Sequence, residues 1–192
     1  MNTEQTMSVG TKQDEVTIPN NPVGSVRTAM TSLVAAPIAM IFSFNDDLVL
    51  RALEGLTQDE LWKAPTDRNN SMLWVAGHVV QTRAMVLQLL GEPVDTGWGK
   101  LFDRGAPAPT IGEVNRYPSR KDIEREMRDV SPRLRAKLAS LSDEYLAGPA
   151  RMQLPGTKTV ADELAFFALH DSYHAGQLAY IRKGLGYPGL AG

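Results

Sequence analysis

The chain has no cysteine among its 192 residues. This absence excludes disulfide bonds, thiolate metal ligands and a cysteine nucleophile supplied by the chain itself. Any thiol chemistry would therefore need a thiol from outside the protein. Histidine is also scarce, with three residues in the whole chain, so the position of each histidine is informative.

Neither sign of charge dominates, because 20 basic and 22 acidic residues leave a formal net charge of −2. This balance does not predict binding to nucleic acid or to an anionic membrane. The most apolar early stretch, residues 33–44, is about a dozen residues long, against the ~20 that span a bilayer. The opening MNTEQTMSVG lacks the basic and apolar regions of a secretory signal. We therefore expect a cytoplasmic protein.

The length of the chain suits one well-buried core. Residues 1–25 are polar, include two prolines and show neither helical nor strand periodicity, so they are predicted to form an N-terminal extension. Residues 26–192 are predicted to form the domain.

Apolar residues at helical spacing, with capping residues ahead of them, predict four long helices. An acidic residue stands three positions after each of Thr57, Ser119 and Thr159, which is the spacing of a capping box. The helices are expected over about 26–53, 72–90, 121–141 and 160–185, with a short helical turn after Thr57 that Pro65 ends.

The segment 92–118 contains four prolines and four glycines and has no sustained period. It is much longer than the ~2 to 8 residues of an ordinary helix connection, so we interpret it as a crossover. The sequence therefore predicts an all-α protein, a four-helix bundle of antiparallel or mixed helices with a long crossover between helices two and three.

Two histidines lie in ALHDSYHAGQ, residues 168–177. Because His170 and His174 are four residues apart on a helix, they project from one face and can converge on one ion. The third, His78, lies on a largely apolar stripe of helix two. Three buried imidazoles without partners would cost roughly 1 to 3 kcal/mol each, and a shared divalent cation would remove part of that cost. The alternative is that they are hydrogen-bonded core histidines.

The sequence HDSYH also invites comparison with the HExxH motif of zinc proteases, in which a glutamate is the general base. Asp171 occupies that position here, but it is shorter and is rotated by ~100° from its neighbour. No histidine, aspartate or glutamate follows His174. The protease interpretation is therefore poor.

The segments SMLWVAGHVVQTRAMVLQLLG and LHDSYHAGQLAYIRKGLG together resemble the DinB-like (DinB/YfiT) family of metal-binding four-helix bundles, over roughly residues 38–186. The resemblance implies an up-down-down-up bundle and a divalent metal on His78, His170 and His174. It also implies activation of a low-molecular-weight thiol such as bacillithiol, mycothiol or glutathione, although other relatives are hydrolases or uncharacterised. The present chain departs from a minimal member in its longer N-terminal extension.

Three neutral imidazoles and an open position would let a metal ion activate water or an external thiol. Zinc and nickel are the expected ions, and iron or manganese would also accept imidazole nitrogen. The expected activity is that of a thiol S-transferase or a hydrolase on a small electrophile, next to walls from Trp74, Met85, Phe166 and Phe167. The alternative is a non-catalytic or stress-linked interaction protein with a structural ion, for which Glu163 could supply a fourth ligand.

Further residues are candidates for contacts around the ion or the substrate. Asp171, Tyr173 and Gln177 are expected around the metal ligands or at the substrate. Arg83, Arg104 and Arg182 either bind carboxylates or are ordinary surface arginines. Trp98 and Phe102 either line the pocket mouth or anchor the crossover. Residues 33–44 carry apolar side chains on more than one side, so we also expect a homodimer.

Overall fold

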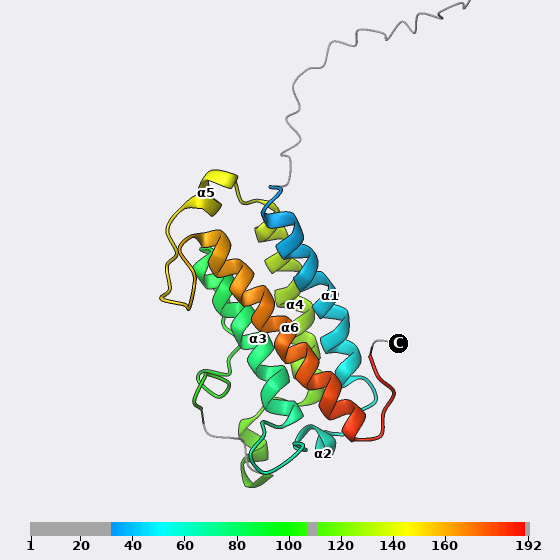
Figure 1. Cartoon of the computed structure of the whole chain (residues 1–192). Helices are drawn as coiled ribbons and strands as arrows, with labels where there is room; N and C mark the ends of the chain where they lie inside the picture. The colour runs from blue at the N-terminus through cyan, green and yellow to red at the C-terminus, as the bar shows by residue number, and fades with distance from the viewer. Residues whose placement is uncertain (1–31, 107–110, 191–192) are drawn as a thin grey trace, which may run out of the picture. The chain divides into compact units, whose positions relative to one another are not determined.

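The computed structural model describes residues 32–106 and 111–190, which form a bundle of helices (Figure 1). Within these stretches a single bridge between Pro149 and Thr159 is the only β-type pairing, so the all-α prediction is confirmed. No helix in them combines the length and the apolar character needed to cross a lipid bilayer. The helices are α1 (Ala35–Leu53), α2 (Gln58–Leu61), α3 (Met72–Leu89), the 3-10 helix η1 (Ile111–Arg116), α4 (Arg120–Ala139), α5 (Asp143–Ala147) and α6 (Val160–Gly184).

Four long helices build the bundle. Helices α1 and α3 lie diagonally across it, because each of them packs against both α4 and α6. In Figure 1, α1 and α6 run from top to bottom, whereas α3 and α4 run from bottom to top. The order along the chain is therefore up-down-down-up, as the family resemblance implied. The connection between the parallel neighbours α3 and α4 has to return along the whole bundle, which explains its length.

The helices begin where the capping residues predicted. The side chains of Thr57, Ser119 and Thr159 each accept a hydrogen bond from the third residue of the following helix, and the acidic side chain at that position bonds back to the cap. Ser71 caps α3 in the simpler form, by accepting a hydrogen bond from the backbone of Trp74. These caps satisfy backbone donors that have no partner inside the helix.

Some helix bounds differ from the predictions. Helix α1 begins at Ala35, with the Ser32 hydroxyl accepting hydrogen bonds from the next backbone amides, and Pro37 lies in its first turn, where the missing N–H costs nothing. The predicted start at residue 26 lies outside the described residues, as does the predicted extension 1–25. The structure adds two short elements that periodicity cannot detect, η1 in the crossover and α5, which Ser142 caps.

A buried ionic cluster, made of Asp46, Arg83, Ser131 and Asp171, joins all four long helices. The guanidinium of Arg83 on α3 donates two hydrogen bonds to Asp171 on α6, at 2.9 and 2.8 Å. It also contacts Asp46 on α1 and donates to the Ser131 hydroxyl on α4 at 2.7 Å. The second oxygen of Asp46 pairs with Arg135 at the edge of the cluster, so that the cluster and Arg135 together hold two positive and two negative charges.

The position of Arg83 corrects the sequence-based expectation for this residue. Its side chain is only 1% exposed, so it is neither a surface arginine nor a group that faces a carboxylate of a bound molecule. A buried guanidinium beside two carboxylates has partners for its charge, and Arg135 offsets the second carboxylate, whereas a buried charge without a partner would cost several kcal/mol. The ionic cluster thus fixes how α6 lies against α3.

Candidate metal centre

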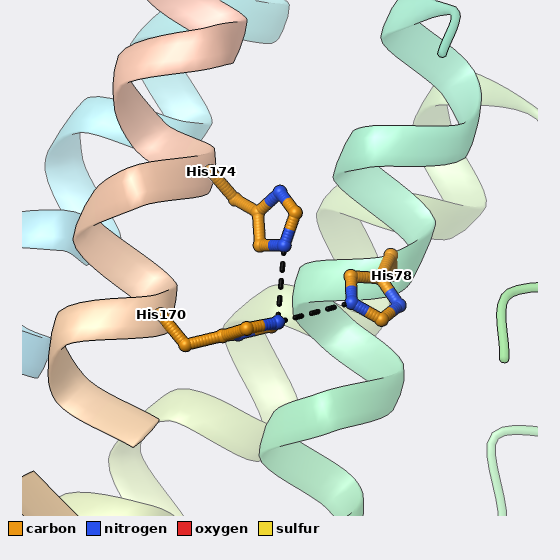
Figure 2. A group of neighbouring side chains, drawn as sticks. All are labelled: His78, His170 and His174. Carbon is orange, nitrogen blue, oxygen red and sulfur yellow. Dashed lines mark hydrogen bonds between the residues drawn. The ribbon is translucent and has the colours of Figure 1, made fainter. Parts of the chain in front are cut away.

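The three histidines of the chain converge between α3 and α6. The Nε2 atom of His170 lies 3.2 Å from Nε2 of His78 and 3.1 Å from Nε2 of His174. Figure 2 shows His170 and His174 projecting from successive turns of α6 toward His78 on α3. Among the described residues, these three form the only group of histidine and acidic side chains close enough to hold one metal ion. We refer to them as the histidine cluster.

The surroundings of the histidine cluster keep its imidazoles neutral. His78 and His174 are buried and His170 is half-buried. Burial lowers the pKa of all three rings, because it penalises the charged imidazolium, and the neighbouring His174 and His78 help to bring the pKa of His170 to about 4. The rings are therefore neutral near pH 7, the form in which imidazole binds a metal.

A backbone carbonyl of the crossover sets the proton position on His78. Its Nδ1 lies 2.6 Å from the carbonyl oxygen of Phe102, which can only accept, so Nδ1 carries the proton and Nε2 keeps its lone pair. The Phe102 ring is fully buried against Gly77, where an added Cβ would lie 2.4 Å from the ring. A side chain at position 77 would displace Phe102, so this glycine allows the crossover to reach His78.

The side chain of Gln177 sets the proton position on His174. Nδ1 of His174 lies 2.7 Å from Oε1 of Gln177, and Nε2 of Gln177 donates to the Tyr173 hydroxyl at 3.0 Å. In this arrangement the carbonyl end of the Gln177 amide faces the histidine and the NH2 end faces the Tyr173 hydroxyl. The imidazole then donates from Nδ1, and the lone pair on its Nε2 faces the cluster. Tyr173 is 62% exposed, so it connects the cluster to solvent rather than to the core.

The arrangement of donors fits one divalent ion. Two Nε2 lone pairs are fixed by their Nδ1 partners and face the same nitrogen of His170, and the Nδ1 atom of His170 is buried without a hydrogen-bond partner among the described residues. Metal–nitrogen bonds of ~2.0 to 2.1 Å in a tetrahedron would put ligand nitrogens roughly 3.3 Å apart, close to the observed separations. A three-imidazole donor set suits zinc, nickel, copper or iron better than calcium or magnesium.

Trp74 forms one wall of the centre. The indole of Trp74 stacks on the His78 ring, with centroids 4.7 Å apart and planes 14° apart. This contact, together with the Phe102 carbonyl, limits rotation of the His78 ring. The expected wall residue Trp74 is therefore next to the cluster.

Two acidic candidates do not face the histidine cluster. Asp171 is held by Arg83 in the ionic cluster. The carboxylate of Glu163 is buried and accepts a hydrogen bond from the backbone amide of Met152 at 2.8 Å, so it secures the α5–α6 connection. It does not supply the fourth ligand that a closed structural site would need.

The remaining candidates, apart from Arg104, have structural contacts. Arg104 is exposed, and Arg182 is buried, where it donates to the backbone carbonyls of Ala52 and Glu54 at the end of α1. Trp98 packs edge-on against Phe102, with centroids 5.4 Å apart, so both aromatic residues anchor the crossover.

A cavity of about 340 Å³ lies one helical turn from the histidine cluster. Gln177 and Tyr173 form part of its wall, together with Val75 on α3. Met85, Phe166 and Phe167, which were expected around the substrate, do not line it. The residues that sequence reasoning missed are Phe102, as a backbone acceptor, and Gly77. The glycine directly before His78 in a helix was the available signal for a close approach.

Comparison with solved structures supports the same fold. A conserved protein from Enterococcus faecalis aligns with a TM-score of 0.62 at 14% identity, over 78% of this chain and 95% of its own. YfiT from Bacillus subtilis aligns with a TM-score of 0.58 at 15% identity, over 88% of this chain and 95% of its own. YfiT is described as "a probable metal-dependent hydrolase with an unusual four-helix bundle topology".

None of the curated proteins compared with the chain matches it. The sequence profile of the DinB superfamily, in contrast, matches residues 41–178. That range contains α3, most of α6 and all three residues of the histidine cluster. The chain belongs to the DinB superfamily.

Proposed function

We propose that the chain is a metal-dependent enzyme that holds one divalent ion on His78, His170 and His174 and acts on a small electrophile. The observation that carries the proposal is the convergence of three Nε2 atoms, two of them with lone pairs fixed by Nδ1 hydrogen bonds. A purely structural ion would need a fourth protein ligand, and no further histidine or acidic side chain of the described residues joins the cluster. An open coordination position favours catalysis.

When bound, the ion would supply a nucleophile at neutral pH, by lowering the pKa of water or of a low-molecular-weight thiol. The chain itself has no cysteine, so a thiol would be a second substrate of an S-transferase. Hydrolysis by water is the other outcome of the same chemistry, and the description of YfiT as a metal-dependent hydrolase supports it. Zinc or nickel is the proposed ion, with iron or manganese as further occupants.

Gln177 and Tyr173 are proposed as positioning residues. Gln177 holds the proton of His174 on Nδ1, and Tyr173 holds the amide of Gln177 in turn. Asp171 is proposed to act at a distance, since its pairing with Arg83 fixes the turn of α6 that carries His170. The uncharged walls of the neighbouring cavity suit a small molecule.

The test is an activity screen with protein purified without a histidine tag and loaded with zinc or nickel. Low-molecular-weight thiols are combined with small electrophiles, and esters and amides are tested in water alone. We expect metal-dependent turnover that His174→Ala abolishes while its circular dichroism spectrum stays native. Equal rates for the wild-type protein and the His174 variant across the screen would refute the enzyme proposal.

The chain is also proposed to form a homodimer. Helix α1 exposes a row of apolar side chains, with Met40 54% and Phe44 64% exposed, and a second copy of the chain would bury them in a homodimer. Light scattering at micromolar concentration tests this, and a monomeric mass would contradict it.

A cytoplasmic location is proposed because the chain has no cysteine and so does not depend on disulfides. Fractionation of cells tests it. Residues 1–25 remain proposed as an extension of the bundle domain.

A further inference from the structure

The cavity beside the histidine cluster continues along α6. A second cavity of about 410 Å³ shares three wall residues with it, namely Pro65, Tyr180 and Ile181. The two cavities are therefore adjacent, between the C-terminal half of α6 and the segment that joins α2 to α3, and we refer to them together as the groove. Both volumes are typical of small-molecule sites.

The inner half of the groove is uncharged. Its walls include the aliphatic side chains of Val75 and Ile181 and the amides of Asn69, Asn70 and Gln177. This mixture suits an uncharged, partly apolar group that also accepts or donates hydrogen bonds. None of the three histidines lines the inner half, and its link to the histidine cluster is Gln177, whose Oε1 lies 2.7 Å from Nδ1 of His174.

The outer half of the groove carries positive charge. Lys63 and Lys183 line it, and no carboxylate does. Both lysines are exposed, and neither has an ion-pair partner in the described part of the chain. Lys183 follows Gln177 by six residues on the same helix, which places the two about 9 Å apart along its axis. In a protein of formal net charge −2, this is a local positive site.

The features of the outer half distinguish a carboxylate from a phosphate as its ligand. Phosphate sites commonly use arginine forks or a helix N-terminus. The outer half has neither, and it ends at Gly184 and Leu185, where α6 presents the negative end of its dipole. Two lysines in this setting suit a singly charged carboxylate better than a doubly charged phosphate.

The geometry points to an elongated substrate, with an uncharged, partly apolar group beside the histidine cluster and a carboxylate at Lys63 and Lys183. This inference rests on the proposed function, since the inner group is the one on which a bound metal would act. It adds a substrate class and two specificity residues, of which Lys183 lies about two and a half turns of α6 after His174.

Calorimetry with matched probes tests the groove. The probes are ω-phenylalkanoates of increasing chain length and the ω-phenylalkanols of the same lengths, titrated into the full chain in metal-free and zinc-loaded forms. Two exposed lysines should favour the acid over the alcohol by about five- to tenfold in Kd at the best length, because exposed ion pairs are individually weak. The metal-free form is included because a carboxylate could otherwise bind the ion.

Variants show whether the two lysines cause the preference. The double variant Lys63→Gln/Lys183→Gln should bind acid and alcohol equally, with the affinity for the alcohol unchanged. Lys158→Gln, at an exposed lysine of the α5–α6 connection, is the matched control and should keep the preference. Equal binding of acid and alcohol to the wild-type protein, no binding of either probe, or a preference that survives in the double variant would each overturn the inference.

The outcome can be separated from the test of the proposed function. A protein that keeps the lysine-dependent preference but is inactive in the screen would retain the groove and lose the enzyme proposal. An active protein with the same kcat/KM for carboxylate-bearing substrates and their neutral counterparts would retain the enzyme proposal and lose the groove.

Discussion

The bundle contains two buried polar regions that are neighbours on the same two helices but differ in how they are satisfied. Arg83 follows His78 by five residues on α3, and Asp171 directly follows His170 on α6. In the ionic cluster, each buried charge has a partner of opposite charge within the protein. In the histidine cluster, the nitrogens that face one another lack a complete set of partners.

The difference separates a structural role from a functional one. Buried charges that are paired in place hold helices in one register because removal of one partner is costly, whereas buried lone pairs that face each other require a proton or a metal ion between them. The ionic cluster therefore sets the positions of α3 and α6, and the histidine cluster depends on those positions to converge. Substitutions in the ionic cluster and in the histidine cluster therefore test the two roles separately.

The largest effect is expected in the ionic cluster. Arg83→Met keeps much of the side-chain volume but leaves the carboxylates of Asp46 and Asp171 in the core without their shared partner. We expect a loss of about 3 to 5 kcal/mol in the free energy of unfolding, measured by urea denaturation. Arg133→Met is the control, because its ion pairs with Glu92 and Asp129 are at the surface and should contribute less than about 1 kcal/mol. Equal losses in the two variants would remove the distinction.

The second effect concerns metal binding rather than folding. His170→Ala removes the nitrogen that both other histidines face, so we expect the metal content, measured by elemental analysis after dialysis, to fall from about one ion per chain to near zero. The unfolding free energy of the metal-free protein should change much less than in the Arg83 variant. The His170 ring is only half-buried, and its removal also removes a buried Nδ1 atom that has no hydrogen-bond partner among the described residues. Leu169→Ala, at an exposed neighbour on α6, should leave the metal content unchanged.

A third effect tests the support of the cluster by the crossover. Gly77→Ala would place a Cβ within 2.4 Å of the Phe102 ring and so push away the carbonyl that binds His78. We expect a loss of about 1 to 3 kcal/mol in stability from overpacking, and metal affinity about tenfold weaker from the lost hydrogen bond to a ligand.

Gly176→Ala on α6 is the matched control for this change. Its added Cβ would meet no atom within 4 Å, so alanine should stabilise the helix slightly, by up to about 1 kcal/mol. Similar losses of stability in the two glycine variants would indicate that the contact with Phe102 is unimportant.

The sequence predicted what local chemistry determines. The starts of α4 and α6 follow from Ser119 and Thr159, because a capping box is complete within four residues. The pairing of His170 with His174 likewise follows from helix geometry alone. The predicted four-helix bundle is also confirmed, as is the up-down-down-up order, which the resemblance to the DinB-like family implied and the residues alone left open.

The sequence could not predict contacts that depend on distant elements or on the backbone. Arg83 has no neighbour in the sequence that marks it as buried, since its partners lie on three other helices. The partner of His78 is a backbone carbonyl, which every residue of the crossover possesses, so no residue type identifies Phe102. Five-residue α5 is too short to show a period.

The smallest effect concerns a half-buried polar pair at the surface, Ser119 and Asp122, which gives a baseline for both buried clusters. The Ser119 side chain caps α4, and its hydrogen bond to Asp122 is the main reason that the pKa of Asp122 is lowered to about 2. Ser119→Ala should cost about 1 kcal/mol at pH 7. It should also raise the pKa of Asp122 toward its ordinary value, which NMR titration of the carboxyl carbon can follow.

The pH dependence of this effect has a definite sign. Because the pKa of Asp122 is lower in the folded than in the unfolded chain, its ionised form stabilises the fold fully above its ordinary pKa near 4, and this contribution is lost as the pH falls toward about 2. The difference in unfolding free energy between wild type and Ser119→Ala should therefore be smaller at pH 3 than at pH 7. A difference that stays constant over this range, or an unchanged pKa of Asp122, would mean that the cap does not act through the carboxylate. Arg133→Met would then be the surface reference against which the two buried clusters are measured.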